Sequence, residues 1–384
     1  MTERIFDLIV VGAGPAGAAA ALEARRLRAD AAVLLVDKAA FPRDKPCGDG
    51  IGPHAVDELA ALGAMEVLDG YPPMGRLRLR APDGTEVARR LVRPNRVVPR
   101  SVLDGRLVDA AVASGAVLHR SRVRSVEDHG DRVVLDGELS GRVVIGADGA
   151  NSAVRRLLGL AGNPPDDLAI AVRGYAPAPP GPPEQFVGWV REGWPAYVWC
   201  FPTGTGLANV GYGLLRSRFD GGRTELHGRL RALLPEPEAD AATLRAHHLP
   251  FSTWRPPPGR GRVLLAGDAA SLVNPLSGEG IYYALASGRL AAAAALQAPG
   301  APLAVYAGLL DGALGGHFRH AAMLARAIRH RRLATATMAA AGASAPVFDT
   351  LVEAGLGHAR VSAGLLARIP PAWLRARLSA AAGG

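Results

Sequence analysis

The stretch Ile5–Asp37, IFDLIVVGAGPAGAAAALEARRLRADAAVLLVD, decides the fold of this chain. It reads as a buried strand over 5–11, an alanine-rich helix over 15–28 and a second buried strand over 32–36. The intervening turn Gly12-Ala13-Gly14-Pro15-Ala16-Gly17 fits GxGxxG, in which glycines let the backbone approach a pyrophosphate at the helix N-terminus. Asp37 stands where a carboxylate can bind ribose hydroxyls. The stretch therefore predicts a βαβ unit that binds FAD or NAD.

Length and composition narrow the classes of protein to consider. With 384 residues, 49% hydrophobic and 21% charged, the chain suits two globular domains and is too apolar for a disordered or fibrous protein. Its two cysteines, Cys47 and Cys200, exclude a disulfide framework and a cysteine metal cluster, so we expect no metal and a cytoplasmic location. The net charge of +9 comes almost wholly from arginine and without a nucleic-acid-binding motif, so we expect no nucleic-acid partner.

Two apolar runs approach the composition of a membrane segment but lack its length or continuity. The run over 8–22 is shorter than the roughly 18 to 20 residues of a membrane span, and it belongs to the βαβ unit. The run over 290–310 is interrupted by Gln297, Pro299, Gly300 and Pro302. It predicts a helix, a loop and a second helix.

The pattern changes twice along the rest of the chain. Alternating arginine and leucine with a PDG turn predict an antiparallel hairpin over 71–94, and helical spacing returns over 101–113. Strands are expected over 117–126, 133–135, 143–145 and 263–266, and a helix from Gly280. Half of the twenty aromatic residues fall between Phe186 and Trp254. Within that segment Tyr197, Trp199 and Phe201 alternate with smaller residues, so their rings share one face of a strand.

Three later segments carry a resemblance to a known group of flavoproteins. VVIGADGANSAVRRLLG over 143–159 resembles the DG motif of the class A flavoprotein monooxygenase superfamily, and VLLAGDAASLVNPLSGEGIYYAL over 263–285 resembles its GD motif. VVPRSVLDGRL over 97–107 is similar to the segment beside the flavin in that superfamily. The resemblance implies FAD as the cofactor and NAD(P)H as the electron donor.

Two further segments resemble the geranylgeranyl reductase family within that superfamily. KPCGDGI over 45–51 is similar to its cysteine-glycine loop, and YVWCFP over 197–202 fits its YxWxFP pattern; GEGI over 278–281 is also closer to this family. Asp49 departs from the pattern, because a small residue is expected there, and this leaves the substrate open. The resemblance places Cys47 near the flavin, where a thiol could donate a proton or tune the cofactor.

The motifs and the resemblance together define a set of candidate site residues. Cys47 is the candidate catalytic residue, and the candidate substrate wall is Tyr197, Trp199 and Phe201. The candidate cofactor-binding residues are Gly12, Gly14, Ala16, Gly17, Asp37, Lys38, Lys45, Cys47, Gly48, Arg100, Asp148, Gly267, Asp268, Pro275, Gly278, Gly280 and Ile281.

Several positions keep a purely structural interpretation beside the functional one. Cys47 could be a buried filler, Lys45 a solvated loop charge, and the aromatic stripe only core. Cys200 is expected to pack in the core, and Trp189 and Trp254 are weaker candidates for the aromatic wall. We expect the pair His247-His248 at the surface, because it lacks partners at metal-ligand spacing. A basic face of Arg319, Arg326, Arg329 and His330 suits either solvent or anionic lipid at the inner membrane face.

The fold class that we predict is α/β: a Rossmann-like FAD-binding domain of parallel sheet and helices, an inserted antiparallel β-sheet substrate domain, and C-terminal helices. We expect the FAD-binding domain to be discontinuous, formed by residues 1–70, 95–162 and 255–300. Residues 71–94 and 163–254 would form the substrate domain, and 301–384 the helical region.

Four functions compete for this arrangement. The first is a reductase that uses NAD(P)H and FAD to reduce carbon–carbon double bonds of a hydrophobic isoprenoid or lipid substrate. The second is a monooxygenase that hydroxylates or epoxidises a hydrophobic or aromatic molecule with O₂. A halogenase is disfavoured because the chain has no lysine after Lys45. A lipid carrier without flavin is disfavoured by the intact motif around Asp268.

Overall fold

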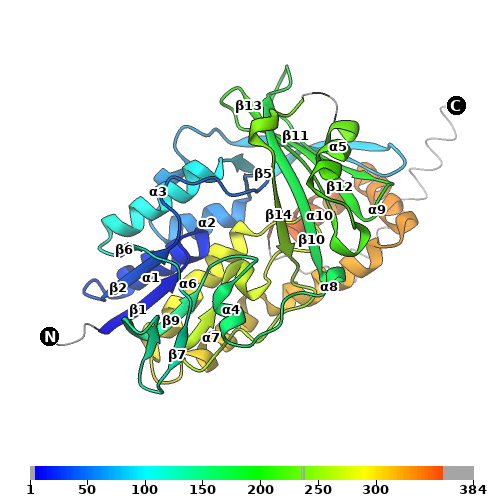
Figure 1. Ribbon diagram of the computed structural model, residues 1–384. Coiled ribbons are helices and arrows are strands. Elements are labelled where there is room, and N and C mark those ends of the chain that lie inside the picture. The colour runs from blue at the N-terminus through cyan, green and yellow to red at the C-terminus, as the bar shows by residue number, and fades with distance from the viewer. Residues whose placement is uncertain (1–4, 235, 237, 358–384) are drawn as a thin grey trace, which may run out of the picture.

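The computed structural model of the protein describes residues 5–234, 236 and 238–357 (Figure 1). Its first sheet follows the strand order β15-β16-β9-β1-β2-β6 and is parallel through its centre. The parallel strands are β1 (Ile5–Val11), β2 (Val33–Asp37), β6 (Val117–Arg120), β9 (Leu139–Gly146) and β16 (Val263–Leu265). The antiparallel additions at its margin are β7 (Val126–Asp128), β8 (Val133–Leu135) and β15 (Gly259–Arg260).

Small residues allow the helices to pack closely on this sheet. Helix α1 (Pro15–Leu27) is alanine-rich, and its first ten residues are all buried. It packs against α3 (Arg100–Ala113) and α6 (Ile281–Gln297). At the α1–α6 crossing, a Cβ on Gly288 would collide with the carbonyl oxygen of Ala16, so glycine is needed at that position. The remaining helices of this part are α2 (Pro53–Ala61), α4 (Ala153–Leu157) and α7 (Pro302–Leu310).

The second sheet follows the strand order β14-β10-β13-β12-β11-β4-β5-β3. Its pairs are antiparallel apart from β4 with β11. The strands are β3 (Gly50–Ile51), β4 (Met74–Arg80), β5 (Glu86–Val97), β10 (Leu168–Pro177), β11 (Gln185–Val190), β12 (Ala196–Pro202), β13 (Leu207–Leu215) and β14 (Arg245–Pro250). Helix α5 (Arg223–Leu233) packs Leu226 and Leu230 against this sheet. Two segments distant in the sequence thus form one sheet.

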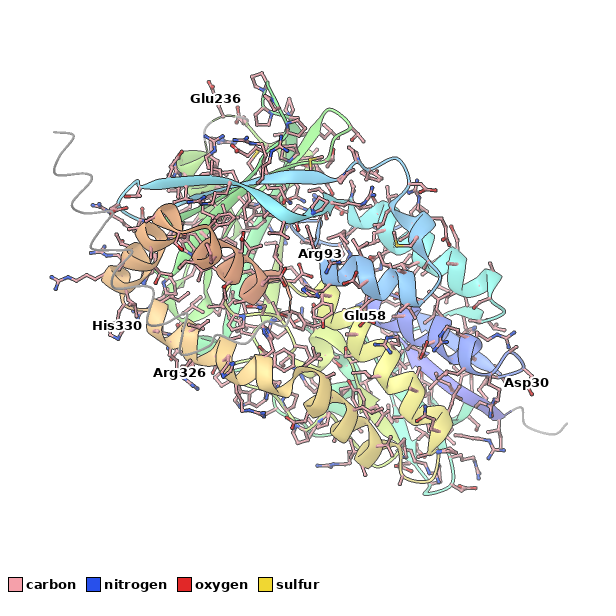
Figure 2. The ribbon with its side chains drawn as sticks, turned by 180° about the vertical axis from the view of Figure 1, so that it is seen from behind. Asp30, Glu58, Arg93, Glu236, Arg326 and His330 are labelled. Carbon is pink, nitrogen blue, oxygen red and sulfur yellow. The ribbon has the colours of Figure 1, made fainter. Side chains whose placement is uncertain are left out.

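Three C-terminal helices cover the end of the second sheet that carries the β4–β5 hairpin. They are α8 (Gly316–Ile328), α9 (Arg331–Ala343) and α10 (Ala345–Leu356), and Figure 2 shows them beside that hairpin. Met338, Val347 and Phe348 from the helices form a buried cluster with Leu77 and Leu79 of β4. None of the helices over the described residues combines the length and apolar character needed to cross a membrane.

These elements confirm the predicted fold class and most predicted elements. The βαβ unit, the hairpin predicted over 71–94, and the helix, loop, helix over 290–310 are all present, although the second strand of the hairpin continues to Val97. The continuous strand predicted over 117–126 is wrong, because the chain leaves the sheet at Ser121 and pairs again only from Val126. The domain boundaries remain a prediction, and residues 358–384 of the expected helical region lie outside the described residues.

Candidate active site

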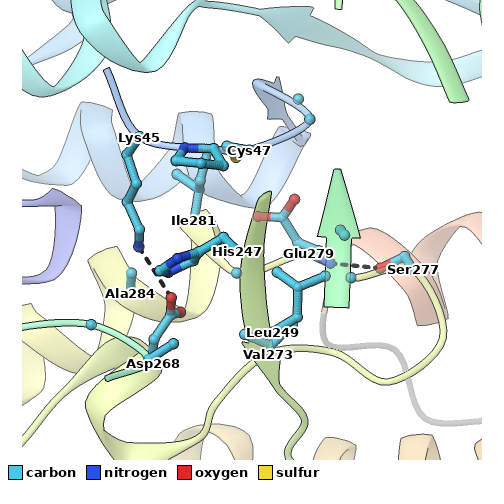
Figure 3. Close-up of a pocket in the computed structure, with 18 of the residues that line it drawn as sticks. Lys45, Cys47, His247, Leu249, Asp268, Val273, Ser277, Glu279, Ile281 and Ala284 are labelled. Atoms are coloured by element: carbon cyan, nitrogen blue, oxygen red, sulfur yellow. Dashed lines mark hydrogen bonds and ion pairs between the residues drawn. The ribbon is translucent and has the colours of Figure 1, made fainter. Parts of the chain in front are cut away.

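A single large cavity of about 1100 Å³ runs between the two sheets and on to the C-terminal helices. Its wall includes the turn before α1, the loop that carries Cys47, the start of α6, the inner face of β12, and side chains of α8, α9 and α10. Figure 3 shows the region where Lys45, Cys47, Asp268 and Glu279 approach one another. All the candidate site residues line this cavity except Gly17, Gly267 and Pro275.

The glycine turn forms one end of the cavity. Gly12 has φ +102, and a Cβ there would collide with the carbonyl oxygen of Ala147 in the neighbouring loop. Gly17 lies behind the cavity wall, where a Cβ would collide with the carbonyl oxygen of Gly12. Gly14 remains open to the cavity, since its nearest neighbours around a Cβ would be the side chains of Arg43 at 3.4 Å and Arg100 at 3.8 Å. The turn thus leaves room where a pyrophosphate would meet the N-terminus of α1.

Asp37 holds the turn in shape from the end of β2. Its carboxylate accepts hydrogen bonds from the backbone N–H groups of Ala13 and Ala39, each at 2.8 Å. A carboxylate has about four acceptor positions, so two backbone bonds leave capacity for ribose hydroxyls. Asp37 and Lys38 both line the cavity at this end. These contacts fit the adenosine half of FAD.

Asp148 organises the loop that follows β9. Its side chain accepts hydrogen bonds from Ser152 Oγ at 2.5 Å and from the backbone N–H groups of Ala153 and Val154 at 2.6 and 3.2 Å. The carboxylate therefore caps the N-terminus of α4. It lines the cavity, but much of its hydrogen-bonding capacity goes to its own loop.

Lys45 and Asp268 form an ion pair across the cavity, with 3.2 Å between Nζ and Oδ2. Burial alone would raise the pKa of Asp268, but the charge and hydrogen bond of Lys45, together with other nearby positive groups such as Arg100, outweigh burial and hold that pKa below its usual value. Asp268 is therefore ionised at neutral pH. The alternative in which Lys45 is merely a solvated loop charge does not hold, because its side chain is 20% exposed and paired.

His247 corrects one of our expectations. It lies on β14 and lines the cavity beside Lys45, rather than at the protein surface (Figure 3). Burial and the nearby Lys45 charge lower its pKa to about 4, so the ring is neutral at neutral pH. Sequence spacing missed this because the neighbours that bury His247 come from distant loops.

The Cys47 loop lies over a buried arginine. Arg100 forms a bidentate ion pair with Asp104, with 2.6 Å from Nε to Oδ1 and 2.8 Å from Nη2 to Oδ2. Nη1 of Arg43 lies 3.3 Å from the same carboxylate. Burial raises the pKa of the Cys47 thiol, and the positive charge of Arg100 opposes that rise without cancelling it. Cys47 consequently holds its proton at neutral pH and is suited to donate it.

Glu279 is a second proton-holding group that sequence reasoning did not single out. It lines the cavity immediately before α6, and its Oε1 accepts a hydrogen bond from the backbone N–H of Tyr282 at 2.8 Å. Burial raises its pKa to about 7. Its negative charge also raises the pKa of Cys47. The GEGI segment was the available signal, but the motif does not reveal that the carboxyl group would be buried.

The aromatic stripe of β12 forms the opposite wall. The rings of Tyr197 and Trp199 lie 5.6 Å apart, and both line the cavity together with Phe201. A Cβ on Gly48 would lie 3.4 Å from the Phe201 ring, and one on Gly278 would lie 2.6 Å from the Tyr197 hydroxyl. The stripe therefore contacts both the cysteine loop and the GEGI loop. Trp189 also lines the cavity, whereas Trp254 and the core residue Cys200 do not.

Beyond the aromatic stripe the cavity continues as an apolar extension. Its wall comes from β4, β11 and the three C-terminal helices, through Leu77, Leu79, Val187, Leu324, Ile328, Leu333, Met338, Leu351, Val352 and Leu356. One cavity therefore joins a polar end that includes the glycine turn to an apolar end.

Comparison with known proteins agrees with this geometry. The family described as FAD binding domain matches residues 6–292, so the fold and the site define an FAD-dependent oxidoreductase. The chain is 38% identical over 314 residues to a menaquinone reductase of Mycolicibacterium smegmatis, covering 74% of this chain and 75% of the relative. It is 33% identical over 317 residues to digeranylgeranylglycerophospholipid reductase 2 of Methanopyrus kandleri, covering 76% and 77%.

A solved structure shows the same fold. The geranylgeranyl bacteriochlorophyll reductase-like protein of Thermoplasma acidophilum aligns with a TM-score of 0.77 at 20% identity, over 97% of this chain and 98% of its own. With these relatives, the chain belongs to the geranylgeranyl reductase family of FAD-dependent oxidoreductases.

We predict that Gly14→Val abolishes FAD binding without unfolding the protein. The backbone at Gly14 is extended and its surroundings have room for a side chain, but a branched side chain would occupy the approach of the pyrophosphate. The purified variant should lack flavin absorbance and fail to take up added FAD, while its circular dichroism stays native. Gly228→Val, on the exposed face of α5, is the control and should keep its flavin. A Gly14→Val protein that still carries FAD would contradict this assignment.

Proposed function

We propose that this enzyme uses NAD(P)H to reduce carbon–carbon double bonds in the isoprenoid chain of a hydrophobic substrate. The observation that carries the proposal is the continuity of the cavity. The loops that carry Cys47 and Gly278 contact the aromatic stripe. From the stripe, the cavity continues as the apolar extension, which is lined in part by α8, α9 and α10. A flexible apolar chain has few groups that can form hydrogen bonds, so the shape of the cavity and contacts with aromatic rings must orient it.

The named activities of the relatives support this substrate class. Menaquinone and digeranylgeranylglycerophospholipid both carry isoprenoid chains, although their head groups differ. The apolar lining of the extension suits the part that the two molecules share. We assign the chain to the extension and leave the head group outside the aromatic wall.

When bound, FAD supplies a hydride acceptor for NAD(P)H and a hydride donor for one carbon of the double bond. The second carbon needs a proton, and Cys47 is the candidate donor because its thiol keeps its proton at neutral pH. Glu279 lines the same cavity, its charge acts on Cys47, and it is protonated in part near pH 7, so we assign to it the return of a proton to the Cys47 sulfur. The substrate thus gains one hydride and one proton, and NAD(P)H is oxidised.

Other cavity residues serve this reaction by orientation and by excluding water. The ion pair with Lys45 holds the Asp268 carboxylate in place beside the proposed FAD site. The neutral ring of His247 adds no charge there. Trp199, only 5% exposed, and its neighbours on β12 keep water from the reacting carbons. NAD(P)H as donor rests on the resemblance of the DG segment over 143–159.

We also propose peripheral contact with an anionic membrane through the corner between α8 and α9. Arg326, Arg329, His330, Arg331 and Arg332 are all exposed there, and Figure 2 shows Arg326 and His330 on the outer side of the helices. Leu333 follows directly; it is 41% exposed and also lines the cavity. A basic rim around an apolar opening suits the transfer of a lipid substrate from a negatively charged bilayer.

The reductase and oxygenase alternatives differ in their need for oxygen. We predict that wild-type enzyme reduces the substrate under anaerobic conditions and that mass analysis shows addition of two hydrogens. Product that forms only in air and contains one atom from labelled O₂ would replace the reductase with the monooxygenase alternative.

In the same assay, Trp199→Ala should raise KM about tenfold, because a lost aromatic contact is worth about 1 kcal/mol or somewhat more. Trp254→Ala is the matched control, since its ring lies outside the cavity wall, and KM should stay within about twofold. Equal KM values for the two variants would remove the aromatic stripe from substrate binding.

The proton-donor role makes a separate prediction. Cys47→Ala should keep FAD and its reduction by NAD(P)H, while slowing substrate reduction roughly a hundredfold, as expected for loss of a general acid. Cys200→Ala, a buried cysteine outside the cavity, should leave both steps unchanged. Equal rates for wild type and Cys47→Ala would make Cys47 a packing residue.

The pH profile tests Glu279. Only the protonated carboxyl can return a proton, so substrate reduction should decline as pH rises through about 7. Glu279→Gln should be slower and should lose this limb of the profile. Arg100 and Asp268, which also affect the Glu279 pKa, stay charged across this range. A Glu279→Gln profile that matches wild type would exclude the role.

We predict co-sedimentation of the protein with vesicles that contain phosphatidylglycerol, and little with purely zwitterionic vesicles. Arg326→Ala/Arg332→Ala should weaken this binding roughly tenfold or more, since each basic residue contributes about 1 kcal/mol at an anionic surface. Arg132→Ala/Arg142→Ala, which removes two arginines from the region of the first sheet rather than from α8 or α9, should bind like wild type. Equal binding of both double variants would refute docking through the α8–α9 corner.

A further inference from the structure

The residue that departs from the family pattern in the cysteine loop is fully buried. Asp49 is 0% exposed and has φ +61, in the left-handed region. Its Oδ2 accepts hydrogen bonds from the Tyr175 hydroxyl at 2.5 Å and from Asn209 Nδ2 at 2.8 Å. Both donors belong to the second sheet, on β10 and β13. The side chain in place of the expected small residue thus ties the cysteine loop to the substrate-side sheet.

Asn209 makes three hydrogen bonds through one buried amide. Its Nδ2 donates to the carbonyl oxygen of Cys47 as well as to Asp49, each at 2.8 Å, and its Oδ1 accepts from the indole N–H of Trp199 at 2.8 Å. An indole can only donate, whereas a carbonyl and a carboxylate accept. The partners therefore specify which way the amide points, and no other orientation satisfies all three.

The other end of the loop is held by the same sheet. Arg173, 1% exposed on β10, pairs with the Asp44 carboxylate and donates to the Lys45 carbonyl oxygen at 3.5 Å. Its guanidinium also lies 4.7 Å from the centre of the Tyr175 ring. The segment 44–49 is consequently fixed at both ends to β10 and β13, although it follows directly from the dinucleotide-binding unit in the sequence.

We propose that Asn209 is a positioning residue that couples the Trp199 ring to the Cys47 loop, so that the substrate wall and the proton donor keep one relative placement. Asn209 does not line the cavity and must act through these two neighbours. Loss of the amide would release the indole and leave the Cys47 carbonyl and the Asp49 carboxylate short of a donor. This role rests on the proposed function of Cys47, whereas the coupling itself can be measured without substrate.

The test uses the FAD-loaded enzyme in a Cys200→Ala background, with Asn209→Leu and Asn209→Asp. The first readout is the rate at which iodoacetamide alkylates Cys47 at fixed pH, which reports thiol placement without any substrate. We expect Asn209→Leu to be alkylated at least fivefold faster, because the loop loses its anchor. Asn209→Asp adds a negative charge beside Asp49, which favours the unreactive thiol form of Cys47, so it should be alkylated more slowly than Asn209→Leu. Thr203→Val removes a buried hydroxyl from the turn of the same β12–β13 pair, away from the cavity, and should change the rate less than twofold.

The second readout is catalysis, split by step. Flavin reduction by NAD(P)H should stay within twofold in the Asn209 variants, while kcat for substrate reduction falls at least tenfold. Thr203→Val serves as the control for a general loss of stability and should retain both rates. Unchanged alkylation and unchanged kcat in the Asn209 variants would overturn the proposal.

A double-variant cycle isolates the coupling. Trp199→Phe keeps an aromatic ring but removes the N–H that Asn209 accepts. Alone it should accelerate alkylation of Cys47, and in the Asn209→Leu background it should add nothing further. Effects that multiply would show that the two residues act independently, against the proposal. If Asn209→Leu fails to fold, Trp199→Phe alone still tests the proposal. An unchanged rate of Cys47 alkylation in that variant would overturn the coupling.

These readouts separate this inference from the proposed function. If wild-type enzyme reduces no isoprenoid double bond while alkylation responds as expected, the proposed function fails and the coupling stands. If substrate is reduced but alkylation does not respond, the coupling fails and the function stands.

Discussion

The close crossing of α1 and α6 is the constraint on which the rest of the site depends. Gly288 lets α6 pack onto the Ala16 carbonyl, where any side chain would collide. Each helix begins at a glycine-containing loop that lines the cavity, the turn over 12–17 for α1 and GEGI over 278–281 for α6. Bringing the two helices together therefore brings two N-termini, each with positive potential, to one cavity. The segments involved are more than 250 residues apart in the sequence.

Burial then divides the ionisable groups of the cavity into two kinds. Asp268 stays charged because Lys45 and other nearby positive groups together compensate for its burial, and Arg100 stays charged because Asp104 compensates for its own. Cys47 and Glu279 lack a compensating partner of that strength, so burial raises the pKa of each. Lys45, Asp268, Cys47 and Glu279 all line the same cavity, and Arg100 lies close enough to Cys47 for its charge to act on the thiol. Groups that stay charged and groups that hold their protons are therefore neighbours within one cavity.

The second sheet does more than close the cavity. Its β12 strand presents the aromatic stripe, and its β10 and β13 strands hold the loop that carries Cys47 through Arg173, Tyr175 and Asn209. The apolar extension is completed by the C-terminal helices, which pack on the β4–β5 hairpin of the same sheet. The proposed substrate wall, the proposed proton donor and the apolar extension consequently share one scaffold, which suits a substrate with few hydrogen-bonding groups.

Local pattern was enough to predict the βαβ unit, the glycine turn with Asp37, the β4–β5 hairpin and the shared face of Tyr197, Trp199 and Phe201. Each depends on periodicity or turn chemistry over a few residues, and such signals are contained in the sequence itself. The burial of His247, the raised pKa of Glu279 and the bonding of Asp49 to Asn209 could not be predicted in this way. Gly17, Gly267 and Pro275 likewise belong to motifs whose spacing does not tell which members reach the cavity. Burial and pKa depend on groups that arrive from distant segments, and only the tertiary structure decides which groups those are.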